Sequence, residues 1–235
     1  QPVLPDHPPG SPLTVLKIAP AAAVAVFAAG MVNSGVLAFI PIWAGELGTP
    51  SEDASAAGAA ALVMGVIYAA SMASQWPAGK ISDHFDRRLV IGALGAGWAI
   101  ISLILTAFVD PGLFLGIVLI GLWGATSLAH YGVAVAHAAD RAQHGQLPAM
   151  ASGLLIVWAV GSIIGPLVAG GLYASPMGMR GVFLFSAVFG AALAGAMLLR
   201  SRSRMAASEA DREDFVNLHA TSAALTEITP DGDAD

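Results

Sequence analysis

Six long stretches of the chain contain no Asp, Glu, Lys or Arg, and this pattern limits what the chain can fold into. An α-helix needs about 20 apolar residues to cross about 30 Å of hydrocarbon, and only helices and closed barrels can span lipid. The sequence therefore predicts an all-α polytopic membrane protein with six transmembrane helices. The stretches are 18–45, 54–79, 89–109, 111–139, 142–179 and 181–199.

Composition excludes several other classes of protein. Apolar residues make up 56% of the chain and the mean hydropathy is +0.73, which does not fit a soluble domain. The net charge is −6 and no basic patch is interleaved with aromatic residues, so we expect no nucleic-acid partner. The chain has no cysteine, which excludes disulfides, thiol catalysis and cysteine-ligated metals within it. We expect no cofactor and no metal, and the first partner is the lipid bilayer.

The positive charges lie almost entirely on one side of the predicted spans. Lys and Arg are enriched in cytoplasmic loops of membrane proteins, so this asymmetry predicts a multi-pass membrane protein with both ends of the chain in the cytoplasm. Arg180 stands alone on the opposite side. The nine residues on the predicted cytoplasmic side are Lys17, Lys80, Arg87, Arg88, Arg141, Arg200, Arg202, Arg204 and Arg212.

The chain divides into three predicted parts. Residues 1–16 contain five prolines and should form a non-helical, semi-rigid cytoplasmic linker; because the chain begins at Gln1, we expect it to be a piece cut from a longer protein. Residues 17–200 form the six-helix transmembrane domain, and residues 201–235 form a disordered, acidic cytoplasmic tail. The expected helices are 18–44, bent near Pro41, 54–78, ending near Pro77, 88–109, 112–140, 148–174 and 180–200.

Polar residues concentrate on three of the six predicted helices. Tyr68, Ser71 and Gln75 share one stripe of the second helix, because residues three and seven apart face the same way. The fourth helix carries a similar stripe through Ser127, His130, His137 and Arg141, whereas the third and sixth helices carry little and can face lipid. Polar groups are costly in hydrocarbon, so these stripes favour a cavity. The predicted substrate-cavity residues are Asn33, Tyr68, Ser71, Gln75, His130, His137 and Trp158.

A simpler interpretation of these polar residues stays open, in which each one bonds its own backbone or a neighbouring helix. If transport were coupled to protons through this part of the protein, His130 and His137 are the only span residues that titrate near neutral pH.

The segment 79–88, Gly-Lys-Ile-Ser-Asp-His-Phe-Asp-Arg-Arg, is the most specific signal in the chain. It resembles the G-x-L-A-D-R-x-G-R-[RK] loop of the major facilitator superfamily (MFS), and it lies between the second and third predicted spans. It departs from that pattern at His84 and Asp86, where Arg and Gly are usual. The matching positions are Gly79, Ile81, Ser82, Asp83, Arg87 and Arg88.

The resemblance implies a cytoplasmic gate made by Gly79, Asp83, Arg87 and Arg88. The carboxylate of Asp83 would accept hydrogen bonds from a helix N-terminus, and Arg87 would hold an acidic side chain. The alternative is a stop-transfer loop with a local Asp–Arg pair.

The fifth predicted helix carries small residues and a proline. Gly161 and Gly165 are spaced for close approach of another backbone, and Pro166 should kink the helix. The segment resembles the G-x-x-x-G-P-x-x-G-G motif of drug-exporting MFS members, with one extra residue before the final pair, Gly170 and Gly171. Because of that departure, we assign a packing and kink role to these five residues and no exporter activity.

Across residues 14–200 the chain resembles the C-terminal six-helix half of an MFS transporter, and Gln75–Lys80 and Val135–Arg141 are most similar to a sparsely characterised bacterial branch. The resemblance implies two inverted three-helix repeats, with the first and fourth helices around a central cavity and the third and sixth at the periphery. It further implies a secondary active transporter, not an enzyme, that moves a small molecule across the bacterial inner (plasma) membrane by alternating access. The N-terminal six-helix half would lie in the same polypeptide.

Two other function classes remain as hypotheses. One is a self-contained six-helix channel or homodimeric carrier. The other is an intramembrane serine protease, which would need Ser34 or Ser152 beside a histidine from another helix. For a transporter, the absence of charge in the polar stripes favours a neutral or mildly polar solute, while the direction of transport and the coupling ion cannot be predicted.

Overall fold

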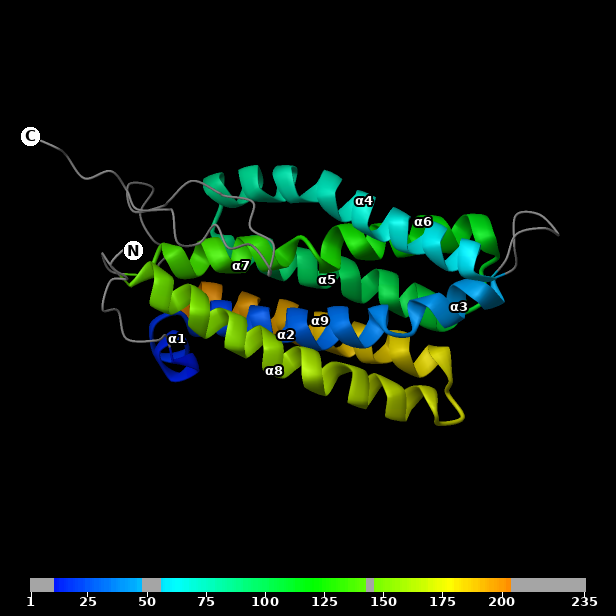
Figure 1. Ribbon diagram of the computed structural model, residues 1–235. Coiled ribbons are helices and arrows are strands. Elements are labelled where there is room, and N and C mark those ends of the chain that lie inside the picture. The colour runs from blue at the N-terminus through cyan, green and yellow to red at the C-terminus, as the bar shows by residue number, and fades with distance from the viewer. Residues whose placement is uncertain (1–10, 48–55, 143–145, 204–235) are drawn as a thin grey trace, which may run out of the picture.

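The computed structural model describes residues 11–47, 56–142 and 146–203, and every regular element in these ranges is an α-helix. The helices form six spans that are long and apolar enough to cross a membrane, and they run side by side along one axis (Figure 1). The predicted all-α fold with six spans is confirmed. The spans are Pro20–Glu46, Ala56–His84, Arg87–Ala107, Leu113–Ala139, Leu147–Tyr173 and Met179–Arg202.

The first and fourth spans are each divided into two helices, where the sequence predicts one continuous helix. In the first span, Pro41 has no N–H to donate to the carbonyl of Leu37, so the helix breaks just before it. The break in the fourth span contains no proline. The first span consists of α2 (Pro20–Leu37) and α3 (Ile40–Glu46), and the fourth of α6 (Leu113–Ser127) and α7 (His130–Ala139). The undivided spans are α4 (Ala56–His84), α5 (Arg87–Ala107), α8 (Leu147–Tyr173) and α9 (Met179–Ser203).

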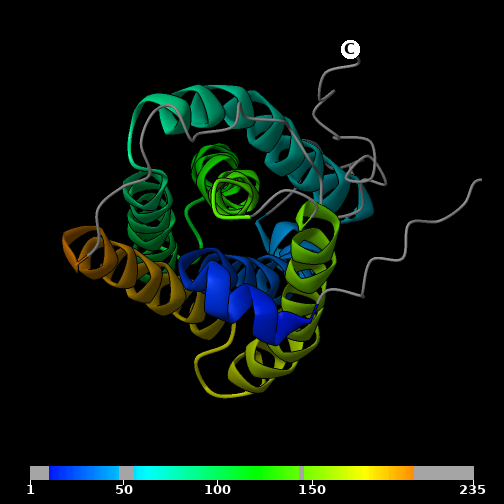
Figure 2. The same ribbon diagram turned by 90° about the vertical axis from the view of Figure 1, so that its left-hand side faces the viewer.

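The spans pack most extensively in three pairs, α2 with α8, α4 with α6, and α5 with α9. If the first three spans are superposed on the last three, the pair formed by spans one and five becomes the pair formed by spans four and two. The pair of spans three and six maps onto itself. This pairing is the one that two inverted three-helix repeats require. Seen from one end, α7 lies inside the ring formed by the other spans (Figure 2).

Glycines allow the close approach of α2 and α8. A methyl group added to Gly161 would lie 2.6 Å from the backbone oxygen of Phe27, and one added to Gly165 would overlap the backbone oxygen of Met31. Gly170 makes an ordinary contact with Phe39. A methyl group added to Gly171 would have nothing within 4 Å, so Gly171 makes no close helix contact among the described residues.

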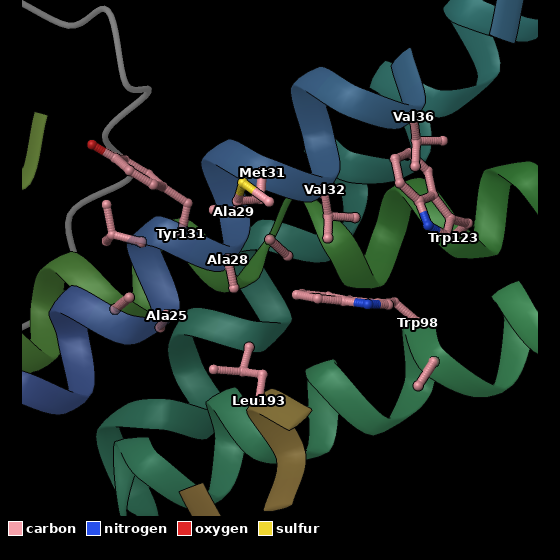
Figure 3. Packing of buried hydrophobic residues seen from close by; sticks show 14 of the residues in the cluster. Ala25, Ala28, Ala29, Met31, Val32, Val36, Trp98, Trp123, Tyr131 and Leu193 are labelled. Atoms are coloured by element: carbon pink, nitrogen blue, oxygen red, sulfur yellow. The ribbon is translucent and has the colours of Figure 1, made fainter. Parts of the chain in front are cut away.

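Trp98 of α5 occupies the centre of the apolar core. Its ring lies between α2 and Leu193 of α9 (Figure 3), and its indole nitrogen donates a 3.0 Å hydrogen bond to the backbone oxygen of Ser186. The hydroxyls of Ser102 and Ser186 are 2.8 Å apart. The polar groups of α5 and α9 therefore face inward and satisfy one another, which leaves apolar side chains such as Leu103 on the outside.

Three predicted boundaries differ from the structure. α4 continues past Pro77 to His84, because an internal proline removes only one helix hydrogen bond. α9 extends to Ser203, beyond the predicted start of the tail. α1 (Pro12–Ile18) is helical, so the prediction that 1–16 is non-helical is wrong for its last residues. Ser11 caps α1 and Pro12 occupies the first turn, where proline is tolerated.

The remainder of the predicted linker, 1–10, and of the tail, 204–235, lies outside the described residues. α1 packs at the end of the bundle where α4 ends and α5 begins (Figure 1).

Candidate functional site

One cavity of about 360 Å³ lies between four of the six spans. Asn33 of α2, Tyr68 of α4 and Trp158 of α8 each lie near the middle of their span, so the cavity is at mid-membrane depth. Leu37 ends α2 and Leu128 follows α6, which places the cavity beside both helix breaks. The lining residues are Asn33, Ser34, Leu37, Tyr68, Ser71, Met72, Gln75, Leu128, Tyr131, Gly132 and Trp158.

The structure brings five of the seven predicted cavity residues together at this site: Asn33, Tyr68, Ser71, Gln75 and Trp158. His130 and His137 were also predicted for the cavity, and neither is among the residues that line it. The reason is the face that α7 presents. The cavity is lined here by Leu128, Tyr131 and Gly132, whose spacing i, i+3 and i+4 places them on one helix face. This face is apolar and aromatic, so a pattern of polar residues alone does not identify it.

His130 is instead a buried residue between helices. Its Nε2 lies 3.2 Å from the backbone oxygen of Ala25 in α2, and its Nδ1 lies 2.5 Å from the backbone oxygen of Ser127. Its ring packs against Trp98, with centroids 4.6 Å apart. A neutral imidazole has one N–H and donates to only one of these two oxygens. The contacts hold the ring within the core, where it joins α7 to α2 and α5.

The polar groups of the cavity are uncharged. The side chain of Gln75 donates a 3.2 Å hydrogen bond to the hydroxyl of Ser71, and both residues are buried. The side-chain oxygen of Asn33 is buried and has no hydrogen-bond partner among the described residues. No Asp, Glu, Lys, Arg or His belongs to the lining in the described ranges. The cavity therefore offers amide, hydroxyl and aromatic groups without a formal charge.

A cluster of ion pairs lies at the end of the bundle where the predicted cytoplasmic charges gather. Arg87 Nε lies 3.1 Å from Asp140 Oδ2, and Arg87 Nη2 lies 3.4 Å from Asp83 Oδ1. Arg87 opens α5, Asp83 is in the last turn of α4, and Asp140 follows α7, so one guanidinium connects three spans. Gly79 lies within α4 in this structure and is buried.

Arg88 connects a fourth span to this cluster. Its guanidinium binds both oxygens of Asp86, and its Nη1 donates a 2.7 Å hydrogen bond to the backbone oxygen of Arg200 near the end of α9. Asp86 also caps α5 by accepting from the backbone N–H of Arg88. Burial raises the pKa of the Asp86 carboxyl, but the hydrogen bonds and positive charge of Arg88 outweigh burial and hold the pKa below its usual value.

His137 belongs to the same end of the molecule. Arg141 Nη1 lies 2.9 Å from His137 Nε2, and the histidine is buried. This position, near the end of α7, places the ring beside Arg141 and outside the lining of the cavity.

The described residues give no support to the protease alternative or to a metal site. They contain no group of three or more His, Cys, Asp or Glu that could hold a metal ion. Ser34 lines the cavity, whereas both ring nitrogens of His130 face backbone oxygens, so the serine–histidine pair that a protease needs is not formed there.

Six apolar spans in inverted repeats around a mid-membrane cavity define a polytopic membrane protein of the transporter type. Sequence comparison identifies the family. A profile of the Major Facilitator Superfamily matches residues 22–229, and the chain belongs to this family of membrane transporters.

Individual relatives match a shorter part of the chain. MFS-type transporters named YcaD from Salmonella newport (strain SL254), Salmonella heidelberg (strain SL476) and Salmonella agona (strain SL483) are each 35% identical over 112 residues. Each match covers 45% of this chain and 26% of the relative, so the chain aligns with about a quarter of the length of these relatives. No solved structure matches the chain.

Proposed function

We propose that this chain is one six-helix half of a secondary active transporter, which moves a small molecule across the bacterial inner membrane by alternating access. The observation that carries the proposal is the uncharged cavity at mid-membrane depth, bordered by two broken helices. In secondary transporters, substrate sites lie near the bilayer midplane beside discontinuous helices. The second six-helix half would close the open side of this cavity, where Tyr68 and Met72 are 47% and 67% exposed.

In this proposal the 79–88 segment is part of the cytoplasmic gate. Arg87 and Arg88 are each only 2% exposed and connect the ends of α4, α5, α7 and α9. A buried charge that loses its partner is strongly destabilised, so the cluster favours one discrete arrangement of these ends over intermediate ones. Rearrangement of the cluster would accompany opening toward the cytoplasm, the side to which we assign it from the distribution of Lys and Arg.

Proton coupling through this half receives no support from the cavity. Neither His130 nor His137 lines it, and among the described residues the lining contains no Asp, Glu, Lys or Arg. If protons drive transport, we expect the proton-carrying residue to lie in the other half.

Cysteine labelling in the full-length protein tests the gate. This chain has no cysteine, so Met72→Cys adds one reactive thiol at the cavity, once any cysteine elsewhere in the polypeptide is replaced by serine. In inside-out vesicles, a membrane-impermeant maleimide reaches this thiol only from the cytoplasmic side. We expect Arg87→Ala to accelerate labelling and Arg202→Ala, which changes an exposed arginine at the same end, to leave the rate unchanged. If Met72→Cys is labelled at the same rate alone, with Arg87→Ala and with Arg202→Ala, then Arg87 is not part of a gate.

A further inference from the structure

The side chains that line the cavity limit the kind of solute that can bind there. We propose that the cavity binds an uncharged solute with a planar or aromatic ring and an amide- or hydroxyl-like group that can both donate and accept hydrogen bonds. This inference rests on the proposed transport function and adds a substrate class to it.

The absence of charge is the first argument. All eleven lining residues are neutral, and the buried pair Ser71 and Gln75 offers only a hydroxyl and an amide. A carboxylate or ammonium group entering this space would lose its water without gaining a counter-ion from these helices. Such transfer is costly, so the lining discriminates against ions.

The side chain of Asn33 supplies the second argument. Its oxygen is buried at the cavity and has no partner among the described residues, although most buried polar atoms are hydrogen-bonded. If the amide oxygen and nitrogen were exchanged, the unmet acceptor would become an unmet donor. A solute group that both donates and accepts satisfies the amide in either orientation.

Aromatic side chains supply the third argument. Tyr68, Tyr131 and Trp158 come from α4, α7 and α8 and border the same cavity. Figure 3 shows the ring of Tyr131 directed away from Trp98. Aromatic faces favour stacking with flat rings at centroid distances of about 4.5–7 Å. Three such faces around a space of about 360 Å³ suit a small, flat molecule.

The same aromatic faces could hold an organic cation through cation–π contacts. The lining contains no carboxylate to balance a positive charge, and the amides of Asn33 and Gln75 can form hydrogen bonds with a neutral solute. A neutral solute is therefore favoured over a cation. Binding of a cation is therefore the main competing outcome of the test.

Four probes of similar size separate these possibilities. Nicotinamide is planar, neutral and carries an amide; nicotinate has the same ring with a negative charge, and 1-methylnicotinamide has it with a positive charge. Cyclohexanecarboxamide keeps the amide and loses the planar ring. Each probe is added to the full-length Met72→Cys protein in detergent, and the rate of maleimide labelling is measured against probe concentration.

A bound probe lowers the labelling rate by the factor 1 + [probe]/Kd. Ligands of this size bind in the millimolar range, so about 10 mM nicotinamide should slow labelling about threefold or more. We expect nicotinate, 1-methylnicotinamide and cyclohexanecarboxamide to have no more than a slight effect at the same concentration. Asn33→Ala and Trp158→Leu should each remove the protection by nicotinamide. Thr126→Ala, on α6 and outside the lining, should keep it.

The inference is overturned if a charged probe protects as well as nicotinamide, if no probe protects, or if protection survives Asn33→Ala. These outcomes leave the proposed function intact, since that is tested separately by the dependence of labelling on Arg87 in vesicles without any probe.

Discussion

Arg87 Nε lies 3.1 Å from Asp140 Oδ2, and the two side chains are only 1% and 3% exposed. This buried ion pair joins the start of α5 to the end of α7, and the second contact of Arg87, with Asp83, adds the end of α4. One arginine thus holds together the ends of three spans that border or adjoin the cavity.

Removing either partner of this pair should destabilise the protein, because the buried charge that remains loses its closest ion-pair partner. We expect Arg87→Ala or Asp140→Ala to cost about 3–5 kcal/mol, measured as chemical or thermal unfolding of the full-length protein in detergent. The double variant Arg87→Met, Asp140→Leu should lose less than the sum of the two single variants, since both charges of the pair are removed together. Asp110→Asn, at an exposed site near the opposite end, is the control. Strict additivity would show that the pair contributes nothing as a unit.

The contact between α2 and α8 predicts different effects for two glycines of one helix. Gly165→Ala places a methyl group against the backbone oxygen of Met31, and backbone atoms cannot move aside cheaply. Overpacking of this kind costs about 1–3 kcal/mol or more. Gly171→Ala meets nothing within 4 Å and should change stability by no more than about 0.5 kcal/mol. If both variants unfold at the same temperature, the close helix contact at Gly165 is not present in the membrane protein.

Asp86 predicts a dependence of stability on pH. Its pKa in the folded protein is lowered, mainly because Arg88 outweighs the opposing effect of burial. The carboxylate therefore contributes stability above its unfolded-state pKa of about 4, and this contribution is lost as pH falls through the lower folded-state pKa. Asp86→Asn keeps a good helix cap but removes the charge.

The comparison for Asp86 is the unfolding temperature of wild type and Asp86→Asn between about pH 7 and pH 3. We expect the variant to be less stable at pH 7 and the difference to shrink in the acidic range. A difference that stays constant down to the lowest pH would mean that the charge of Asp86 does not contribute.

His130 predicts a change in stability without a change in the cavity. His130→Ala removes the contacts with α2 and with Trp98, and we expect a loss of about 1–3 kcal/mol. Labelling of Met72→Cys, and its protection by nicotinamide, should remain as in the parent protein. His84→Ala, at an exposed position, is the control for loss of a histidine. If His130→Ala has normal stability but is no longer protected by nicotinamide, then His130 contributes to the cavity and not to helix packing.

The number of spans and their approximate limits could be predicted because charge-free length alone decides whether a segment can cross lipid. Five of the cavity residues could be predicted because polar groups in a span repeat with the helix period, as Tyr68, Ser71 and Gln75 do. His130 was predicted for the cavity as well, because the same polarity that suits a cavity also suits a hydrogen bond to another helix. Its partner is the backbone oxygen of Ala25, and because every residue has a backbone oxygen, the sequence does not identify this contact.

The ion pairs illustrate the same limit. The resemblance of 79–88 to the family loop implies that Arg87 holds an acid, and in the structure it contacts Asp83 and Asp140. Asp140 is far from Arg87 in sequence, and only the packing of α7 beside α5 identifies it. The helical state of α1 depended on Ser11 as a cap and on Pro12 falling in the first turn, details that the overall proline content conceals.

The mass of the native polypeptide tests whether this chain is one half of a twelve-helix transporter. The measurement is a denaturing immunoblot of membranes from the source cells, with an antibody against residues 205–235. We predict a band at about twice the 23.7 kDa of this chain, since a second six-helix half should be part of the same polypeptide. A band at the mass of the chain itself would show that no second six-helix half is part of the same polypeptide. It would favour a homodimeric carrier or a self-contained six-helix channel.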